Sequence, residues 1–150
     1  MARVKDYQHI LIATDATPDS DVVALRAART AEFYGSRITL LHVLEHLPTD
    51  IPVTPVPPEG VDKIECFRND ARKALEALAG RTALSTAEIS VAVTADSARK
   101  EITRFAHEQD VDLIIIGAHE RHGIALFQGA TTDGVVHKAH CDVLVVHIGV

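Results

Sequence analysis

An unbroken run of large apolar residues, Leu113-Ile114-Ile115-Ile116, stands in the second half of the chain. Two similar runs are Ile10-Leu11-Ile12-Ala13 and Val143-Leu144-Val145-Val146. Short runs that are rich in β-branched residues and do not alternate with polar ones are typical of strands buried on both faces of a parallel sheet. We interpret residues 38–44 and 89–93 as two further strands. The sequence therefore predicts a parallel sheet of five strands.

Helical patterns occupy the intervals between these strands. The first helix is expected to begin at Thr17-Pro18, because threonine is a good N-terminal cap and proline is favoured at the first helical position. It should end at Gly35, a typical C-terminal cap. Strands and helices then alternate, and right-handed crossovers place helices on both faces of the sheet, which gives a doubly wound α/β fold. The other helices are expected over 61–78, after a cap at Asp96 or Ser97, and around Val135, Val136 and Ala139.

Length and composition limit the class of protein. The 150 residues are enough for one domain, over 1–150, and 47% of them are hydrophobic. A net charge of −6 argues against a binder of duplex nucleic acid, which needs a basic face. No apolar run approaches the roughly 18 residues of a membrane span. Two cysteines, Cys66 and Cys141, make no disulfide framework, so a cytoplasmic protein is expected.

Residues 45–60 hold five of the six prolines. Proline removes a backbone donor and cannot continue a helix or a central strand, so this segment is expected to be an extended surface loop. It follows the second predicted strand, at the end of the sheet where such folds bind ligands. Two interpretations stay open: a lid over a ligand, or a tolerated insertion.

In open α/β sheets the ligand lies beyond the carboxyl ends of the strands. The first turn there, Asp15-Ala16-Thr17-Pro18, has no glycine, which excludes the dinucleotide-binding fingerprint at its usual place, and the sequence has no P-loop. Glycines instead follow the fourth strand, at Gly117 and Gly123, and Gly129 precedes the last helix. Free backbone N–H groups at a helix N-terminus suit phosphate oxygens. The alternative is that these glycines only serve the turns.

Four segments are informative together: 7–15 (YQHILIATD), 40–43 (LLHV), 112–119 (DLIIIGAH) and 141–146 (CDVLVV). They resemble the universal stress protein family, and the resemblance extends over nearly the whole chain in the right order. The resemblance implies a sheet of order 3-2-1-4-5 in an adenine-nucleotide alpha-hydrolase-like fold, a homodimer and a cytoplasmic stress role. Many members bind ATP through a G-x-x-G motif, nine further residues and G-[ST].

Applied to individual residues, the resemblance implies that Asp15 contacts the nucleoside and that the Val43 backbone meets adenine. Gly117 matches the first glycine of the motif, and Glu120 stands where the second is expected. Gly129 matches the third only if the spacer is one residue shorter, and Ala130 then takes the Ser/Thr position. The candidate nucleotide-binding residues are Ala13, Thr14, Asp15, Val43, Gly117, His119, Glu120, Arg121, Gly123, Gly129, Ala130 and Thr131.

Glu120 is the larger departure from the motif. A carboxylate ~4 Å from a phosphate charge costs about 4 kcal/mol at an effective dielectric of 20. Arg121 could pair with the phosphate or with Glu120, and Mg²⁺ could bridge the carboxylate and the phosphates. The expected ligand is ATP or AMP, alone or with Mg²⁺, and Glu120→Gly should tighten ATP binding. The alternative is a scaffold that binds an unknown protein partner and has lost nucleotide binding.

Three other functions fit the sequence less well. A receiver-type switch would need a second acid beside Asp15, where Thr14 and Ala16 stand. Paired histidines at 119/122 and 137/140 have metal-ligand spacing, but the interpretation as surface and loop residues is favoured, and no metal site is predicted. Neither cysteine has a visible base, so no catalytic residue is assigned and at most slow ATP hydrolysis is expected.

The last predicted strand, 143–146, is expected at the edge of the sheet with no helix after it. An uncovered apolar edge invites pairing with another chain. The sequence therefore predicts a homodimer through the C-terminal strand.

Overall fold

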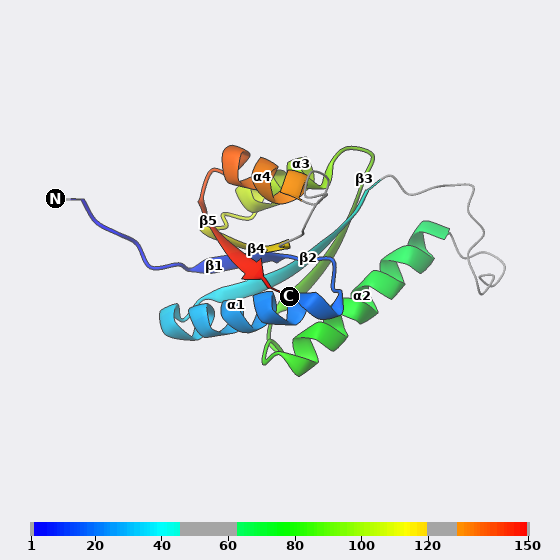
Figure 1. Cartoon of the computed structure of the whole chain (residues 1–150), viewed down its shortest axis with the longest axis horizontal. Helices are drawn as coiled ribbons and strands as arrows, with labels where there is room; N and C mark the ends of the chain where they lie inside the picture. The colour runs from blue at the N-terminus through cyan, green and yellow to red at the C-terminus, as the bar shows by residue number, and fades with distance from the viewer. Residues whose placement is uncertain (1, 46–62, 120–128, 150) are drawn as a thin grey trace.

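A computed structural model of the chain describes residues 2–45, 63–119 and 129–149, which form a parallel sheet with helices on both faces (Figure 1). The sheet order is β3-β2-β1-β4-β5, as the family resemblance implied. The predicted doubly wound α/β fold is confirmed. The strands are β1 (His9–Ala13), β2 (Arg37–Glu45), β3 (Glu88–Thr94), β4 (Leu113–His119) and β5 (Asp142–Ile148).

The four helices of the described ranges lie where the sequence predicted helices. A short 3-10 turn (Pro18–Ser20) precedes α1 (Asp21–Tyr34), and Gly35 ends α1 in the left-handed conformation at φ +68°. The prediction that the Thr17 side chain caps this helix was wrong, because its hydroxyl donates to Asp15 instead. The remaining helices are α2 (Lys63–Arg81), α3 (Ala98–Glu108) and α4 (Gly129–Lys138).

Two apolar cores lie on the two faces of the sheet. Helices α1 and α2 cover one face, where Ile10 and Ile12 of β1 meet Val23 and Leu75. Helices α3 and α4 cover the other face, where Leu11 and Ile114 meet residues such as Val135. Successive side chains of a strand point to opposite faces, so every residue of the central strand β1 is buried. The unbroken apolar runs of β1 and β4 were therefore interpreted correctly.

The apolar run 143–146 in β5 is not buried throughout, unlike the runs in β1 and β4. Only Val146 is buried, and Val145 is 40% exposed. Within the described chain β5 pairs with β4 alone, so it is an edge strand with a neighbouring strand on one side only. The prediction of burial on both faces was wrong for this strand, whereas its place at the edge is confirmed.

The predictions for α2 and for the proline-rich segment can be compared with the structure only where their residues are described. Leu75 and Leu78 of α2 are buried as expected, but Val61 lies outside the described residues. Of the proline-rich segment only Glu45 is described, so neither its lid nor its insertion interpretation falls within the described residues.

No helix in the described ranges is long and apolar enough to cross a membrane.

Candidate functional site

The central strand is shorter than its neighbours at the carboxyl end of the sheet. β1 ends at Ala13, which lies opposite Leu41 of β2 and Ile116 of β4. β2 continues to Glu45 and β4 to His119. The chain beyond β1 turns toward α1, and the sheet order reverses between β1 and β4, which is where such folds form a crevice.

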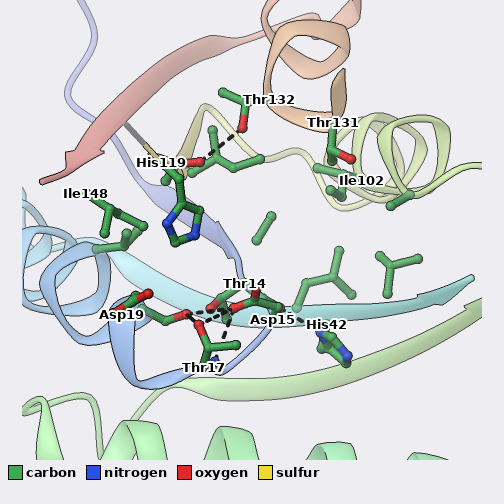
Figure 2. A pocket seen from close by; sticks show the side chains of 18 of the residues that line it. Thr14, Asp15, Thr17, Asp19, His42, Ile102, His119, Thr131, Thr132 and Ile148 are labelled. Atoms are coloured by element: carbon green, nitrogen blue, oxygen red, sulfur yellow. Dashed lines mark hydrogen bonds between the residues drawn. The ribbon is translucent and has the colours of Figure 1, made fainter. Parts of the chain in front are cut away.

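A cleft of ≈ 480 Å³ occupies this end of the sheet (Figure 2). The described residues that line it come from the ends of β1, β2, β4 and β5, from the loop after β1, and from the first turns of α1, α3 and α4. They are Ala13, Thr14, Asp15, Thr17, Asp19, Ser20, Val23, Leu41, His42, Val43, Glu45, Ala98, Ile102, Ile116, Gly117, His119, Thr131, Thr132 and Ile148.

Asp15 is held by its own loop. Its Oδ1 accepts hydrogen bonds from the Thr17 N–H at 3.1 Å, from the Thr17 hydroxyl at 2.9 Å and from the Ser20 hydroxyl at 2.9 Å. Aspartate commonly bonds the backbone two residues ahead in such turns, and this contact fixes the direction of the carboxylate. Figure 2 shows the His119 ring extending from the end of β4 toward Thr14 and Asp15.

The same contacts set the charge of the Asp15 carboxyl. Burial works to raise its pKa, but the hydrogen bonds from Thr17 and Ser20, with the nearby His119, outweigh burial and hold the pKa below its ordinary value. Asp15 is therefore an anion at neutral pH.

The backbone beside Asp15 is fixed by contacts with β2. The Thr14 N–H donates to the Leu41 carbonyl at 3.0 Å, and the Thr14 carbonyl accepts a 2.8 Å hydrogen bond from His42 Nδ1. Ala16 has φ +58°, a backbone conformation that residues other than glycine rarely adopt. Its N–H donates to the Thr14 hydroxyl at 3.0 Å. Strained backbone of this kind often lies at functional sites.

The end of β2 forms another wall of the cleft. Val43 lines it, and the Glu45 carboxylate accepts a 2.6 Å hydrogen bond from the Ala98 N–H. Ala98 is the first residue of α3, whose N-terminal N–H groups have no partner within the helix. Ser97 stands at the predicted N-cap position, but its side chain makes no capping hydrogen bond. A carboxylate from a distant strand therefore caps this helix.

Gly117 is constrained by packing. A Cβ atom there would lie 2.6 Å from Ile148 Cδ1 and 2.9 Å from Val23 Cγ2. The Gly117 carbonyl accepts a 3.0 Å hydrogen bond from the Thr132 hydroxyl, which ties the first turn of α4 to β4. The close approach of α1 and β5 thus requires a residue without a side chain at this position.

The structure brings together seven of the residues that the sequence singled out. Gly129 and Ala130 belong to the first turn of α4 but are not among the described residues that line the cleft. Glu120, Arg121 and Gly123 lie outside the described residues. The seven lining residues are Ala13, Thr14, Asp15, Val43, Gly117, His119 and Thr131.

Sequence reasoning missed several contributors to the site. Thr17 was detectable, because an aspartate in a turn commonly bonds the backbone two residues ahead, whereas no such local rule indicates Ser20. His42 was quoted only within a family segment, and no local signal linked it to Thr14. Glu45 was counted as the start of a loop, although it ends β2 and caps α3.

The described histidines and cysteines outside the cleft do not form a metal site or an activated nucleophile. No group of three His, Cys, Asp or Glu in the described ranges could hold a metal ion. His137 pairs with Asp133 at 3.3 Å on α4, and His122 lies outside the described residues. Burial, with Asp142 and Asp112 nearby, raises the pKa of the Cys141 thiol, which keeps it in its less nucleophilic form.

Comparisons with known proteins agree on one family. The Universal stress protein family model matches residues 6–147. The chain is 36% identical over 149 residues to universal stress protein A homolog 2 of Coxiella burnetii, which covers 95% of this chain and 97% of that protein. It is 31% identical over 140 residues to homolog 1 of the same organism, with 93% and 96% covered.

Solved structures share the fold. A universal stress protein in complex with cAMP has a TM-score of 0.67 and 18% identity, with 96% of this chain and 99% of that chain covered. The universal stress protein from Archaeoglobus fulgidus in complex with dAMP has a TM-score of 0.64 and 20% identity, with 94% and 98% covered. At these identities the likeness concerns the fold alone.

Proposed function

The chain belongs to the universal stress protein family, and from this premise we propose that it binds an adenine nucleotide in the cleft at the carboxyl end of its sheet. One observation carries the proposal: Asp15, Val43 and Thr131, which come from three separate segments, line the same cleft. Its volume of ≈ 480 Å³ lies within the range of small-molecule sites.

The groups that line the cleft indicate which ligand groups it can bind. The Asp15 carboxylate can accept hydrogen bonds from nucleoside hydroxyls or from the adenine amine. The backbone at Val43, near the end of β2, would meet the adenine edge. Two proteins of the same fold bind cAMP and dAMP, which supports an adenine ligand, and either ATP or AMP is the starting hypothesis. A role for Glu120, Arg121, Gly123 and Mg²⁺ at the phosphates belongs to this proposal and rests on the sequence alone.

The proposed role is that of a cytoplasmic stress-response module whose state depends on the nucleotide. Binding rather than turnover is proposed, with slow ATP hydrolysis as the upper limit, because the roles we assign to the described lining residues are hydrogen bonding and packing. A module of this kind would act on a protein partner that its sequence does not identify.

A homodimer through β5 is part of the proposal. β5 is an edge strand of the described sheet, and its unpaired backbone groups are available to a second copy. Val145 is 40% exposed, and Val22 and Leu25 on the neighbouring α1 are 45% and 50% exposed. These side chains line one groove with Leu144, so pairing would cover apolar surface as well as backbone.

Native mass spectrometry of freshly purified protein tests the nucleotide proposal. Wild type should carry, or take up on addition, one adenine nucleotide per chain. Ala98→Trp places a large side chain in the lining of the cleft and should abolish uptake. Ala77→Trp, at an exposed position of α2 outside the cleft, is the matched control and should leave uptake unchanged. Equal uptake by both variants would contradict the location.

A scaffold function without nucleotide is the second candidate. Phe33 at the end of α1 is 81% exposed, and its ring meets that of Tyr34 edge-on, with centroids 4.8 Å apart. Exposed aromatic side chains are typical anchors of protein interfaces. Under this candidate the wild-type protein would bind no nucleotide in the same mass-spectrometric experiment.

A further inference from the structure

The described walls of the cleft carry three carboxylates, from Asp15, Asp19 and Glu45, and no lysine or arginine. A cleft of ≈ 480 Å³ is roughly 10 Å across if it is taken as a sphere, which is about one Debye length at 0.1 M salt. Salt therefore does not fully screen these carboxylates from a ligand within the cleft. A ligand that adds negative charge meets repulsion there, and each further phosphate adds to it.

Several side-chain donors of these walls are already committed within the protein. The hydroxyls of Thr17 and Ser20 donate to Asp15, and the Thr132 hydroxyl donates to the Gly117 carbonyl. His42 Nδ1 donates to the Thr14 carbonyl. Phosphate oxygens accept hydrogen bonds and need free donors, whereas ribose hydroxyls and the adenine amine are donors. The committed donors and the carboxylates together favour the nucleoside part of a ligand over its phosphates.

The N-terminus of α3 is also occupied. A helix N-terminus attracts anions through its free N–H groups and its dipole. Here the Glu45 carboxylate already accepts the Ala98 N–H at 2.6 Å. A phosphate would have to displace an internal anion to use this position.

We infer that the described walls of the cleft select against phosphate charge, so that the cleft takes an adenine nucleoside or nucleoside monophosphate in preference to a triphosphate. We assign this selectivity to Asp19 and Glu45. The Asp15 carboxylate also repels phosphate, but it is expected to bind the nucleoside itself, so its replacement would not isolate the effect of charge. The inference rests on the proposed nucleotide binding and narrows its ligand class.

Titration calorimetry with adenosine, AMP and ATP, in a buffer that contains a chelator of divalent cations, measures the selectivity. Wild type should bind AMP at least about tenfold more tightly than ATP, and adenosine at least as tightly as AMP. Tenfold corresponds to about 1.4 kcal/mol. Raising the salt concentration should reduce the AMP/ATP ratio, because salt screens the carboxylates.

Charge-neutralising variants assign the effect to residues. Asp19→Asn should improve ATP binding several-fold more than adenosine binding. Glu45→Gln should act in the same direction, since its amide oxygen can still accept the Ala98 N–H while the charge is removed. Glu32→Gln removes the same charge from an exposed position of α1 outside the cleft and is the matched control. Thermal unfolding of each variant checks that the fold is retained.

The outcomes separate the two proposals. If ATP binds wild type as tightly as AMP, the selectivity is refuted while nucleotide binding stands. If Asp19→Asn and Glu45→Gln change the ratio no more than Glu32→Gln does, their assigned role is wrong. If neither adenosine, AMP nor ATP binds, the proposed function itself fails and the selectivity fails with it.

Discussion

The carboxylate of Glu45, the last residue of β2, lies 2.6 Å from the backbone nitrogen of Ala98, the first residue of α3. The two residues are 53 positions apart in the sequence, so this contact is tertiary. It fixes the start of α3 against the end of β2 and closes one side of the cleft. The stability of the helix and the shape of the site therefore depend on the same hydrogen bond.

Replacing this carboxylate should destabilise the protein. Loss of a helix cap costs about 1 kcal/mol, so Glu45→Ala should lower the free energy of unfolding by that amount. Glu45→Gln should lower the free energy of unfolding by less, because the glutamine amide oxygen still accepts the hydrogen bond. Urea denaturation of both variants measures the difference, and equal stabilities of wild type and Glu45→Ala would show that the contact does not stabilise the helix.

Gly117→Ala should destabilise the fold by about 1–3 kcal/mol, the usual cost of overpacking a core. The new methyl group would lie 2.9 Å from Val23 Cγ2, on a short and buried side chain that has little room to move. The clash with Ile148 Cδ1 is removed by Ile148→Val, so the double variant should recover part of the loss. Urea denaturation measures both. An unchanged stability of Gly117→Ala would mean that packing does not require the glycine.

The Asp15 carboxyl should make stability depend on acid pH. Its pKa is lower in the folded protein than its ordinary value, so the folded state binds this proton more weakly than the unfolded state. The resulting stabilisation is present above about pH 3.9, the ordinary aspartate value, and is lost as the pH falls through the folded-state pKa. Unfolding free energies of wild type and Asp15→Asn should therefore converge at the acid end. Parallel profiles would contradict the assignment.

Tyr7 should titrate in strongly alkaline solution. The hydrogen bond from its hydroxyl to Asp142 Oδ2, at 2.8 Å, is the main cause that raises the pKa of Tyr7 to about 12. The hydrogen bond contributes fully to the stability of the fold below about pH 10, the ordinary pKa of tyrosine, and this contribution is lost as the pH rises toward 12. Ultraviolet titration of Tyr34→Phe, which leaves Tyr7 as the only tyrosine, measures this pKa. Adding Asp142→Asn should lower it toward 10, and no change would exclude Asp142 as the cause.

A charge on the edge strand should prevent the proposed dimer. Wild type should sediment at about twice the chain mass of 16.2 kDa at micromolar concentration. Val145→Lys should sediment as a monomer, because lysine on an edge strand opposes pairing. Val136→Lys introduces the same charge at a 46% exposed position of α4 and should remain dimeric. A monomeric wild type would refute the interface.

The parts of the fold that were predictable from sequence are those with local or periodic signals. β1 and β4 could be recognised from unbroken apolar runs, and the end of α1 from Gly35. β5 carries the same kind of run yet is partly exposed, because composition does not distinguish a central strand from an apolar edge. Only the strand order, which came from the family resemblance, placed it at the edge.

The site was predictable to the extent that the ends of strands define it. The place of Asp15 follows from the rule that ligands bind beyond the carboxyl ends of parallel strands, whereas Val43 was implied by the family resemblance. The contacts of His42 with Thr14 and of Glu45 with Ala98 join distant segments through single side chains, and no spacing in the sequence encodes them. Gly117 was assigned to the phosphates by its place in a motif, whereas its surroundings show a packing requirement that a motif cannot reveal.

The proposed function depends most on where an adenine ligand binds. A titration of ¹⁵N-labelled protein with AMP locates the ligand directly by amide chemical shifts. We predict that the largest shifts fall on Thr14, Asp15, Val43, Ala98 and Thr131, and that they saturate with a single dissociation constant. Amides at the outer groove between α3 and α4, such as that of His107, should change little. Shifts confined to that groove, or no saturable shifts at millimolar AMP, would contradict the account.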